Sequence, residues 1–160
     1  MLRFGYPEWR EDSHGSNAER SVSAGPLRSA ARAALLFTGR PRENMTVGDA
    51  LLQRRVCRRY ATDFVESPPE SKIGVARNAR PGDWPLNGLR HLPEGGTSGW
   101  YIWAGDTFSA NPDFFELHQV SDVPDLLPLV FPYLGLPPGW RFLLAENHED
   151  AWYDPELLPV

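Results

Sequence analysis

The sequence predicts an α+β domain with a small, mainly antiparallel sheet, an N-terminal helix and a second short helix packed on the sheet. One observation is a helical apolar pattern that follows Thr46, before the strand patterns begin. Another is a series of short aromatic and apolar runs, bounded by Gly and Pro, between residues 72 and 153. Because helical and strand patterns are clustered and do not alternate regularly, they favour α+β over a parallel α/β arrangement.

The chain divides at Met45 into an extension and a folded part. Residues 1–22 are polar and poor in aliphatic side chains, so they cannot offset the entropy of the chain by burying apolar surface. Residues 23–39 carry Leu and Ala at helical spacing. We therefore expect residues 1–44 to be disordered or partly helical, and residues 45–160 to form one domain. Either Met1 or Met45 could be the true start.

The first element of the domain is a helix from Thr46 to about Asp63. Thr46-x-x-Asp49 has the form of a capping box, which satisfies backbone N–H groups at a helix start. Near one apolar face of this helix, on which we expect Cys57 to be buried, fall Val47, Ala50, Leu51, Cys57, Ala61 and Phe64. The rest of the helix carries four arginines, which form either a solvated face or a patch for an acidic partner: Arg54, Arg55, Arg58 and Arg59.

The next segment has the patterns of strands and turns. Ile73–Ala79 alternates as a strand does, and Arg80–Asp83 has the composition of a turn. Leu86–Gly96 contains Asn-Gly and Gly-Gly pairs, which predict a long loop. Trp100–Ala104 has large side chains on both faces, which is typical of a central strand covered on each side, and Gly105-Asp106 turns the chain.

The second half of the domain continues in the same way. Phe115–Val120 is a predicted strand with Phe115 and Leu117 facing inward. The segment 121–134 predicts a helix capped by Asp125, with Pro128 at its third position, that ends or kinks at Pro132.

The last predicted elements form a turn and two strands. Pro138-Gly139 fits the centre of a type II turn because glycine accepts the positive φ there. Trp140–Ala145 follows as a strand, and Ala151–Tyr153 adds a short edge. Because Trp100 and Trp140 each open an apolar run after a glycine, we expect them to be core anchors on adjacent strands. Trp103 and Trp152 could be core or surface residues.

Charge is distributed unevenly along the chain. Residues 1–60 carry 11 Arg and 6 acids, a net charge of +5, whereas residues 61–160 carry 5 Lys or Arg and 15 acids, a net charge of -10. An acidic domain is a poor binder of nucleic acid because each phosphate contact needs a cation. Acidity suits a basic protein partner through complementary fields, or it only keeps the domain soluble.

Targeting signals and cysteine content point to a cytoplasmic protein. No segment approaches the roughly 18 consecutive apolar residues of a membrane span, and the first ten residues lack the apolar run of a signal peptide. Cys57 is the only cysteine, which excludes a disulfide framework and a cysteine-based zinc site. We expect no membrane association.

Catalytic motifs are not evident. The four histidines, at positions 14, 91, 118 and 148, show no local metal-ligand spacing. There is no Gly-x-Ser-x-Gly nucleophile motif and no glycine-rich phosphate loop ending in lysine. We therefore predict no catalytic residue, no metal and no cofactor, and we expect that the protein is not an enzyme.

Three motifs occur in an order that resembles a known family. They are Ser-Gly-Trp…Ala-Gly-Asp at 98–106, Asn-Pro-Asp at 111–113 and Gly-Trp-Arg-Phe at 139–142. This block resembles the bacterial immunity-protein domain of polymorphic-toxin systems, the thirty-third immunity family and formerly a domain of unknown function, over roughly residues 72–154. The matching positions are Gly99, Trp100, Ala104, Gly105, Asp106, Pro112, Asp113, Gly139, Trp140 and Phe142.

The resemblance implies a cytoplasmic protein that binds a cognate protein toxin and neutralises it without catalysis. The family assigns the motif residues to the fold and to no catalytic role. The N-terminal extension and the Leu-Pro-Pro-Gly segment at 136–139 depart from shorter family members, which leaves the toxin and the binding face open. The oligomeric state is open as well.

Acidic residues at predicted turns are the candidates for binding such a partner, because side chains at strand ends can project without disturbing the sheet. They are Asp106, Asp113, Glu146, Glu149 and Asp150. Two other functions are compatible with the sequence. One is a metal-dependent or acid/base hydrolase built around His91, His118 and Asp106. The other is a carbohydrate- or peptide-binding module that uses Trp103 and Tyr101.

Overall fold

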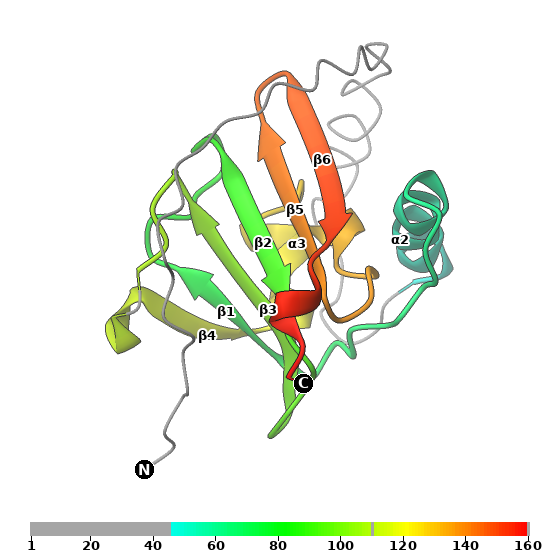
Figure 1. The fold of residues 1–160 in the computed structure, drawn as a ribbon, viewed down its shortest axis with the longest axis horizontal. Coiled ribbons are helices and arrows are strands. Elements are labelled where there is room, and N and C mark those ends of the chain that lie inside the picture. The colour runs from blue at the N-terminus through cyan, green and yellow to red at the C-terminus, as the bar shows by residue number, and fades with distance from the viewer. Residues whose placement is uncertain (1–45, 110, 160) are drawn as a thin grey trace.

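A computed structural model describes residues 46–109 and 111–159, so the predicted extension and both candidate start residues lie outside the described residues. The fold is α+β, as predicted, with one six-stranded sheet in the order β4-β1-β3-β2-β5-β6 (Figure 1). The helices and strands are α2 (Val47–Arg59), β1 (Lys72–Ala76), β2 (Leu86–Arg90), β3 (Thr97–Ala104), β4 (Phe115–Gln119), α3 (Val123–Leu126), β5 (Trp140–Ala145) and β6 (His148–Tyr153). Short 3-10 helices are η2 (Pro112–Phe114), η3 (Val120–Asp122), η4 (Phe131–Tyr133) and η5 (Pro155–Leu157).

The sheet is mainly antiparallel, which confirms the prediction. Only β1 and β3 pair in parallel, and β1 lies between β3 and β4. In Figure 1, α3 lies behind the sheet, whereas the C-terminal η5 (red) crosses in front of it. The two faces are therefore covered by different parts of the chain.

Helix α2 begins at the predicted capping box. The Asp49 N–H donates to Thr46 Oγ1 at 3.3 Å, and the Thr46 N–H donates to Asp49 Oδ2 at 2.8 Å. The helix ends at Arg59, earlier than predicted, and Ala61 has a φ of 52° where the chain turns away. The predicted apolar face is only partly correct, because Cys57 is buried whereas Val47 is 81% exposed and Leu51 is 54% exposed.

The side of α2 that packs inward is more polar than the apolar pattern suggested. Gln53 is fully buried and its Nε2 donates to the Phe131 carbonyl at 3.2 Å. Cys57 is also buried, and its thiol donates to the Gly135 carbonyl at 3.2 Å. A Cβ on Gly135 would lie 2.8 Å from the Gln53 Cβ. Close backbone approach at this glycine and hydrogen bonding therefore decide which side of the helix faces the core.

Strand β2 (Leu86–Arg90) replaces the first part of the long loop predicted over Leu86–Gly96, and residues 91–96 form a loop as predicted. The strand lies inside the sheet between β3 and β5. A Cβ on Gly88 would lie 2.2 Å from the Phe142 ring, so glycine is required for the ring to cross the strand. Asn87 donates from Nδ2 to the Gly105 carbonyl at 2.8 Å. The Asn-Gly pair thus serves packing in a strand, and it does not form the turn that its composition indicated.

Strand β3 is covered on both faces, as predicted. Trp100 and Ile102 are buried in the main core, and Trp103 is buried in a smaller cluster with Tyr101 packed against it. Trp100 is 1% exposed and its indole N–H donates to the Leu134 carbonyl at 3.2 Å. Trp140 is only half-buried, and it lies on β5, which β2 separates from β3. The prediction that Trp100 is a core residue is therefore confirmed. The predictions that Trp140 is a core anchor and that the two residues lie on adjacent strands are wrong.

Strand β4 forms one edge of the sheet, and one of its predicted inward residues points to solvent. Phe115 packs against the smaller cluster, in ring contact with Tyr101 and Phe108. Leu117 pairs with Gly74 and is 67% exposed. At this edge no further strand or helix among the described residues covers the side chain, so the alternation of the strand does not bury it.

The proline-rich segment after β4 begins its helix earlier than predicted. The residue that precedes α3 is Asp122 and not Asp125, and Pro124 sits in the first turn. The helix ends before Pro128, and the chain continues through η4. After it the predicted turn is present, since the Trp140 N–H donates to the Pro137 carbonyl at 3.2 Å and Gly139 has a φ of 88°.

Strand β6 is longer than the predicted edge strand and forms the second edge of the sheet.

Among the described residues, none of the helices is both long enough and apolar enough to span a bilayer.

Candidate partner-binding surface

One end of the sheet gathers most of the predicted acidic residues. Leu86 pairs with Ala104 on one side and with Leu144 on the other, so β2 begins where β3 and β5 end. The strands β1, β3 and β5 all end here, and β2, β4 and β6 begin here. We call this the loop end and define it as residues 77–85, 105–109, 111–114 and 146–147.

Three predicted acids lie exposed at the loop end. Asp106 follows β3, Asp113 lies in η2 just before β4, and Glu146 lies in the turn between β5 and β6. Within the described part of the chain their carboxylates form no hydrogen bond or ion pair. Strands are spaced about 5 Å apart, so these three acids are distributed along a rim of roughly 20 Å. They are available to a partner without any cost to internal contacts.

The other two predicted acids are held by the fold. Glu149 Oε2 accepts a hydrogen bond from the Tyr133 hydroxyl at 2.5 Å, and the same carboxylate forms an ion pair with Arg59 of α2. Asp150 Oδ1 accepts from the Ala151 backbone N–H at 2.8 Å, on the edge strand β6. Glu149 therefore links β6 to η4 and α2. Asp150 accepts a hydrogen bond from a backbone N–H of the edge strand β6.

The glycines of the family-like motif shape the backbone around this end and its opposite. A Cβ on Gly99 would lie 2.1 Å from the His91 carbonyl oxygen, and φ there is 82°. Gly105 also has a φ of 82°, and its N–H donates to the Pro85 carbonyl at 2.9 Å. Both positions require glycine, whose missing side chain permits the positive φ.

The remaining motif residues are structural as well, apart from the two acids. Phe142 and Ala104 are buried in the main core, Trp140 packs against it, and Gly139 forms the turn before β5. Pro112 opens η2, where the Asp113 N–H donates to Asn111 Oδ1 at 3.0 Å. Of the motif, only the carboxylates of Asp106 and Asp113 are left without a structural role among the described residues.

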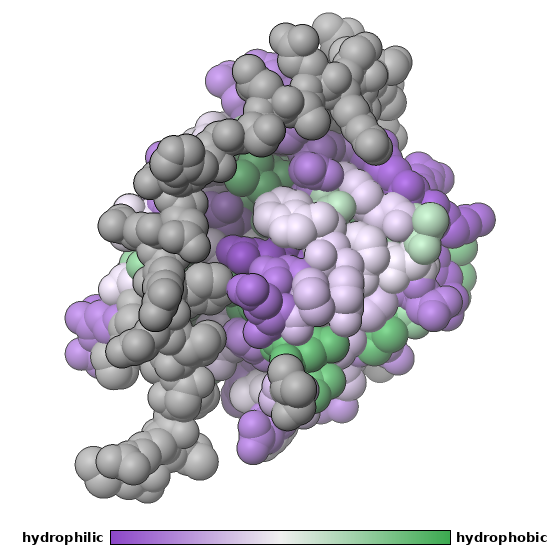
Figure 2. All heavy atoms as spheres, in the orientation of Figure 1, coloured by the Kyte–Doolittle hydropathy of each residue, from purple (hydrophilic) through white to green (hydrophobic). Residues whose placement is uncertain are grey.

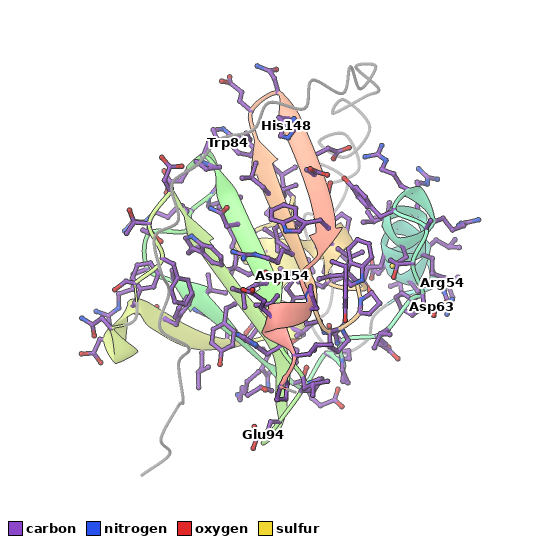
Figure 3. The ribbon with its side chains drawn as sticks, in the orientation of Figure 1. Arg54, Asp63, Trp84, Glu94, His148 and Asp154 are labelled. Carbon is purple, nitrogen blue, oxygen red and sulfur yellow. The ribbon has the colours of Figure 1, made fainter. Side chains whose placement is uncertain are left out.

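Sequence reasoning missed Trp84 at the loop end. Trp84 is 37% exposed and stands two residues before β2, next to the turn at Arg80–Asp83. Figure 3 shows Trp84 at the same end of the sheet as His148, whereas Glu94 lies at the opposite end. A tryptophan outside any predicted strand and directly after a predicted turn was the signal that could have identified it.

A shallow cavity of about 460 Å³ lies at the loop end, and Trp84 is not one of its lining residues. Its lining comes from the segment after β1, the segment before β2 and the end of β3. The residues are Arg77, Asn78, Arg80, Asp83, Ala104 and Gly105. Arg77 pairs with Glu116 at 2.9 Å, and Asn78 hydrogen-bonds both backbone groups of Ala104. Arg80 and Asp83 are the charged lining residues that no ion pair holds within the described residues.

The opposite end of β2 contains a buried cation. Arg90 has no exposed surface, and its Nε donates to the Ser98 carbonyl at 3.1 Å. Nη1 donates to the carbonyls of Val65 at 2.8 Å and Leu136 at 2.5 Å, and Nη2 donates to that of Glu66 at 3.2 Å. Burial lowers the pKa of Arg90 to about 10. This side chain ties the segment after α2 to β3 and to the segment before β5.

The residues of the alternative hydrolase site, His91, His118 and Asp106, do not come together. His91 lies beyond the Arg90 end of β2, with Nδ1 2.9 Å from the Leu157 carbonyl oxygen, whereas Asp106 lies at the loop end. His118 Nε2 is 3.9 Å from Glu116 on β4. Among the described residues, no group of three or more His, Cys, Asp or Glu could hold a metal ion. Burial raises the pKa of the Cys57 thiol, which disfavours the thiolate.

The aromatic binding surface of the alternative carbohydrate- or peptide-binding module, Trp103 and Tyr101, is also not formed. Trp103 is 4% exposed and packs edge-on against Phe108, so it cannot stack on a ligand from solvent. Tyr101 contacts His91 and Phe115 by its ring. Figure 2 shows a face with pale residues of intermediate hydropathy at its centre and both purple, hydrophilic and green, hydrophobic residues around them.

Fold and surface define a small α+β domain in which Asp106, Asp113 and Glu146, at one end of the sheet, have exposed carboxylates without a hydrogen bond or ion pair among the described residues. A family model described as the Imm33-like domain matches residues 52–154, more than half of the chain. The chain therefore belongs to the Imm33-like domain family, an immunity-protein family, which confirms the resemblance seen in the motifs. Comparisons with curated proteins and with solved structures found no match.

Proposed function

We propose that this protein is a cytoplasmic immunity protein of a bacterial polymorphic-toxin system. It binds its cognate toxin and neutralises it without catalysis. Membership of an immunity-protein family supports a protein toxin as the kind of partner. The observation that carries the proposal further is a set of exposed carboxylates at the loop end that form no hydrogen bond or ion pair in the part of the chain that the structure describes, those of Asp106, Asp113 and Glu146.

Electrostatics supports a basic toxin surface as the counterpart of the loop end. Residues 61–160 have a net charge of -10, and fields of opposite sign accelerate the encounter of two proteins. The three acids lie on turns, where a partner can approach them without displacing a strand. The rim along which the three acids are distributed is wide enough to form one side of a standard protein interface, which buries about 800 Å² on each partner.

The proposal is tested with the C-terminal domain of the secreted protein that is encoded next to this gene. We expect a complex between the two purified proteins and survival of cells that co-express them. The variant Asp106→Lys, Asp113→Lys, Glu146→Lys should bind at least about tenfold more weakly, mainly through slower association, and with a smaller dependence on salt. Its melting temperature should stay within a few degrees of the wild type.

A matched control changes the same charge elsewhere. Glu70, Glu94 and Asp125 are exposed, and their side chains form no hydrogen bond or ion pair within the described residues. They lie away from the loop end, before β1, between β2 and β3, and in α3. Their reversal to Lys should leave association nearly unchanged. Equal losses in both triple variants would show that only total charge matters, and no loss in either would show that the acids are not used.

A further inference from the structure

We propose that Trp84 is the aromatic anchor of the loop end and that it packs against an arginine-bearing, basic surface of the toxin. This inference rests on the proposed function and assigns the central contact of that interface. In protein interfaces a few aromatic side chains near the centre carry most of the binding free energy, and charged residues surround them. The position, support and surroundings of Trp84 fit that role.

The register of the sheet places Trp84 between two of the free acids. Leu86 pairs with Ala104 and with Leu144. Trp84 precedes Leu86 by two residues, Asp106 follows Ala104 by two, and Glu146 follows Leu144 by two. Because adjacent strands lie about 5 Å apart, Trp84 stands between the strand ends that carry Asp106 and Glu146.

The backbone beneath Trp84 is held firmly. The Pro85 carbonyl accepts the Gly105 N–H at 2.9 Å, and Asn87 Nδ2 donates to the Gly105 carbonyl at 2.8 Å. The segment that carries Trp84 is thus bonded directly to the turn that carries Asp106. An anchor that is already fixed loses little conformational entropy on binding, which favours affinity.

Comparison with Trp152 shows what is distinctive about Trp84. The two are similarly exposed, at 39% for Trp152 and 37% for Trp84. The Trp152 ring already has the Arg141 guanidinium over it, 5.8 Å from its centroid. Among the described residues no ring or cation contacts the Trp84 indole in this way. Trp84 is therefore an exposed indole that no cation of its own described chain covers.

An arginine is the partner side chain that these surroundings favour. Its guanidinium can lie over an indole face, an attraction that grows when water is excluded, and can pair with carboxylates at the same time. Asp83 and Asp106 adjoin Trp84 in the chain and through the Gly105 bond. The nearby cavity does not bear on this choice, because Arg77 and Arg80 line it together with Asp83 and Trp84 is not one of its lining residues.

The experiment measures binding of the same toxin domain to Trp84→Ala, Trp84→Phe and Trp152→Ala, with thermal melts of all three. Trp84→Ala should lose about 30-fold or more in affinity, through faster dissociation and with an unchanged salt dependence. Trp84→Phe keeps an aromatic ring and should lose less. Trp152→Ala is the matched control and should change affinity less than about threefold.

Outcomes separate the anchor from the proposed function. A wild-type protein that binds the toxin together with Trp84 variants of unchanged dissociation rate would overturn the anchor and leave the proposed function in place. A larger loss for Trp152→Ala than for Trp84→Ala would overturn it too. A wild-type protein that does not bind the toxin domain would overturn both. If the alanine variant melts early, the phenylalanine variant gives the same test in a folded protein.

Discussion

The two ends of strand β2 use large side chains in opposite ways. At its last residue, Arg90 is fully buried and donates to four backbone carbonyls. Two residues before its start, Trp84 is 37% exposed. An ordinarily exposed cation is inside and an ordinarily buried indole is outside. If the proposed function is correct, the Arg90 end of the strand contributes stability and the loop end contributes recognition.

The largest expected effect is at the Arg90 end. Arg90→Met removes the donor of four carbonyls at once, and each buried acceptor left without a partner costs about 1–3 kcal/mol. We expect the free energy of unfolding to fall by at least about 4 kcal/mol, measured by urea denaturation. Arg90→Lys keeps the charge but cannot reach all four carbonyls, so it should also be strongly destabilised. A stable lysine variant would show that charge and not geometry matters here.

The next effect tests the tryptophan that pairs with Arg90 across the sheet. Trp100 is 1% exposed, and the Arg90 guanidinium carbon lies 5.7 Å from its ring centroid. Trp100→Ala should lower the free energy of unfolding by about 3–5 kcal/mol. Trp140→Ala should cost clearly less, because that side chain is only half-buried. Equal costs in the same denaturation experiment would contradict the contrast between the two residues.

The smallest expected effect concerns the hydrogen bond between Tyr133 and Glu149, which lies near the loop end and which we expect to stabilise the fold without contacting the toxin. Glu149 pairs with Leu144 near that end, yet it accepts the Tyr133 hydroxyl. Tyr133→Phe should lower the free energy of unfolding by about 1–3 kcal/mol at pH 7, because a charge-assisted hydrogen bond is lost. Toxin affinity should be unchanged. A loss of affinity with unchanged stability would place Tyr133 and Glu149 in the interface.

The pH dependence gives a second measurement on the same pair. Burial, with a smaller contribution from Tyr60, raises the pKa of Tyr133 above its ordinary value of 10.0. Above pH 10 the unfolded state loses the phenolic proton while the folded state keeps it, so stability falls as pH rises. The wild type should therefore lose its advantage over Tyr133→Phe as pH increases beyond about 10. A constant difference between the two would contradict the raised pKa.

Most of the fold could be predicted from the sequence because its signals were local. The capping box at Thr46, the two-sided strand around Trp100 and the turn at Gly139 are each specified by neighbouring residues. Strand β2 could not be predicted, because Gly88 is required by Phe142, which lies more than 50 residues further along the chain. The orientation of α2 depends on Gly135 in the same way.

The candidate surface was only partly accessible to sequence reasoning. Turns expose acids, so Asp106, Asp113 and Glu146 could be predicted as exposed from composition alone. The contacts of Glu149 with Tyr133 and Arg59 join three elements that are distant in sequence, and no local pattern encodes them. Trp84 had a local signal, its place directly after a predicted turn, but the extent of its exposure depends on what the rest of the fold leaves uncovered.

The place of β1 in the sheet has a consequence for how the chain folds as it is synthesised. Both neighbours of β1, the parallel strand β3 and the antiparallel strand β4, follow it in the sequence. Ile73 and Val75, which are buried in the finished domain, therefore leave the ribosome before either neighbouring strand exists. Pairing between distant segments is slow because loop entropy must be overcome first. Synthesis of β3 and β4 is thus the step that allows the exposed apolar strand β1 to be paired and buried.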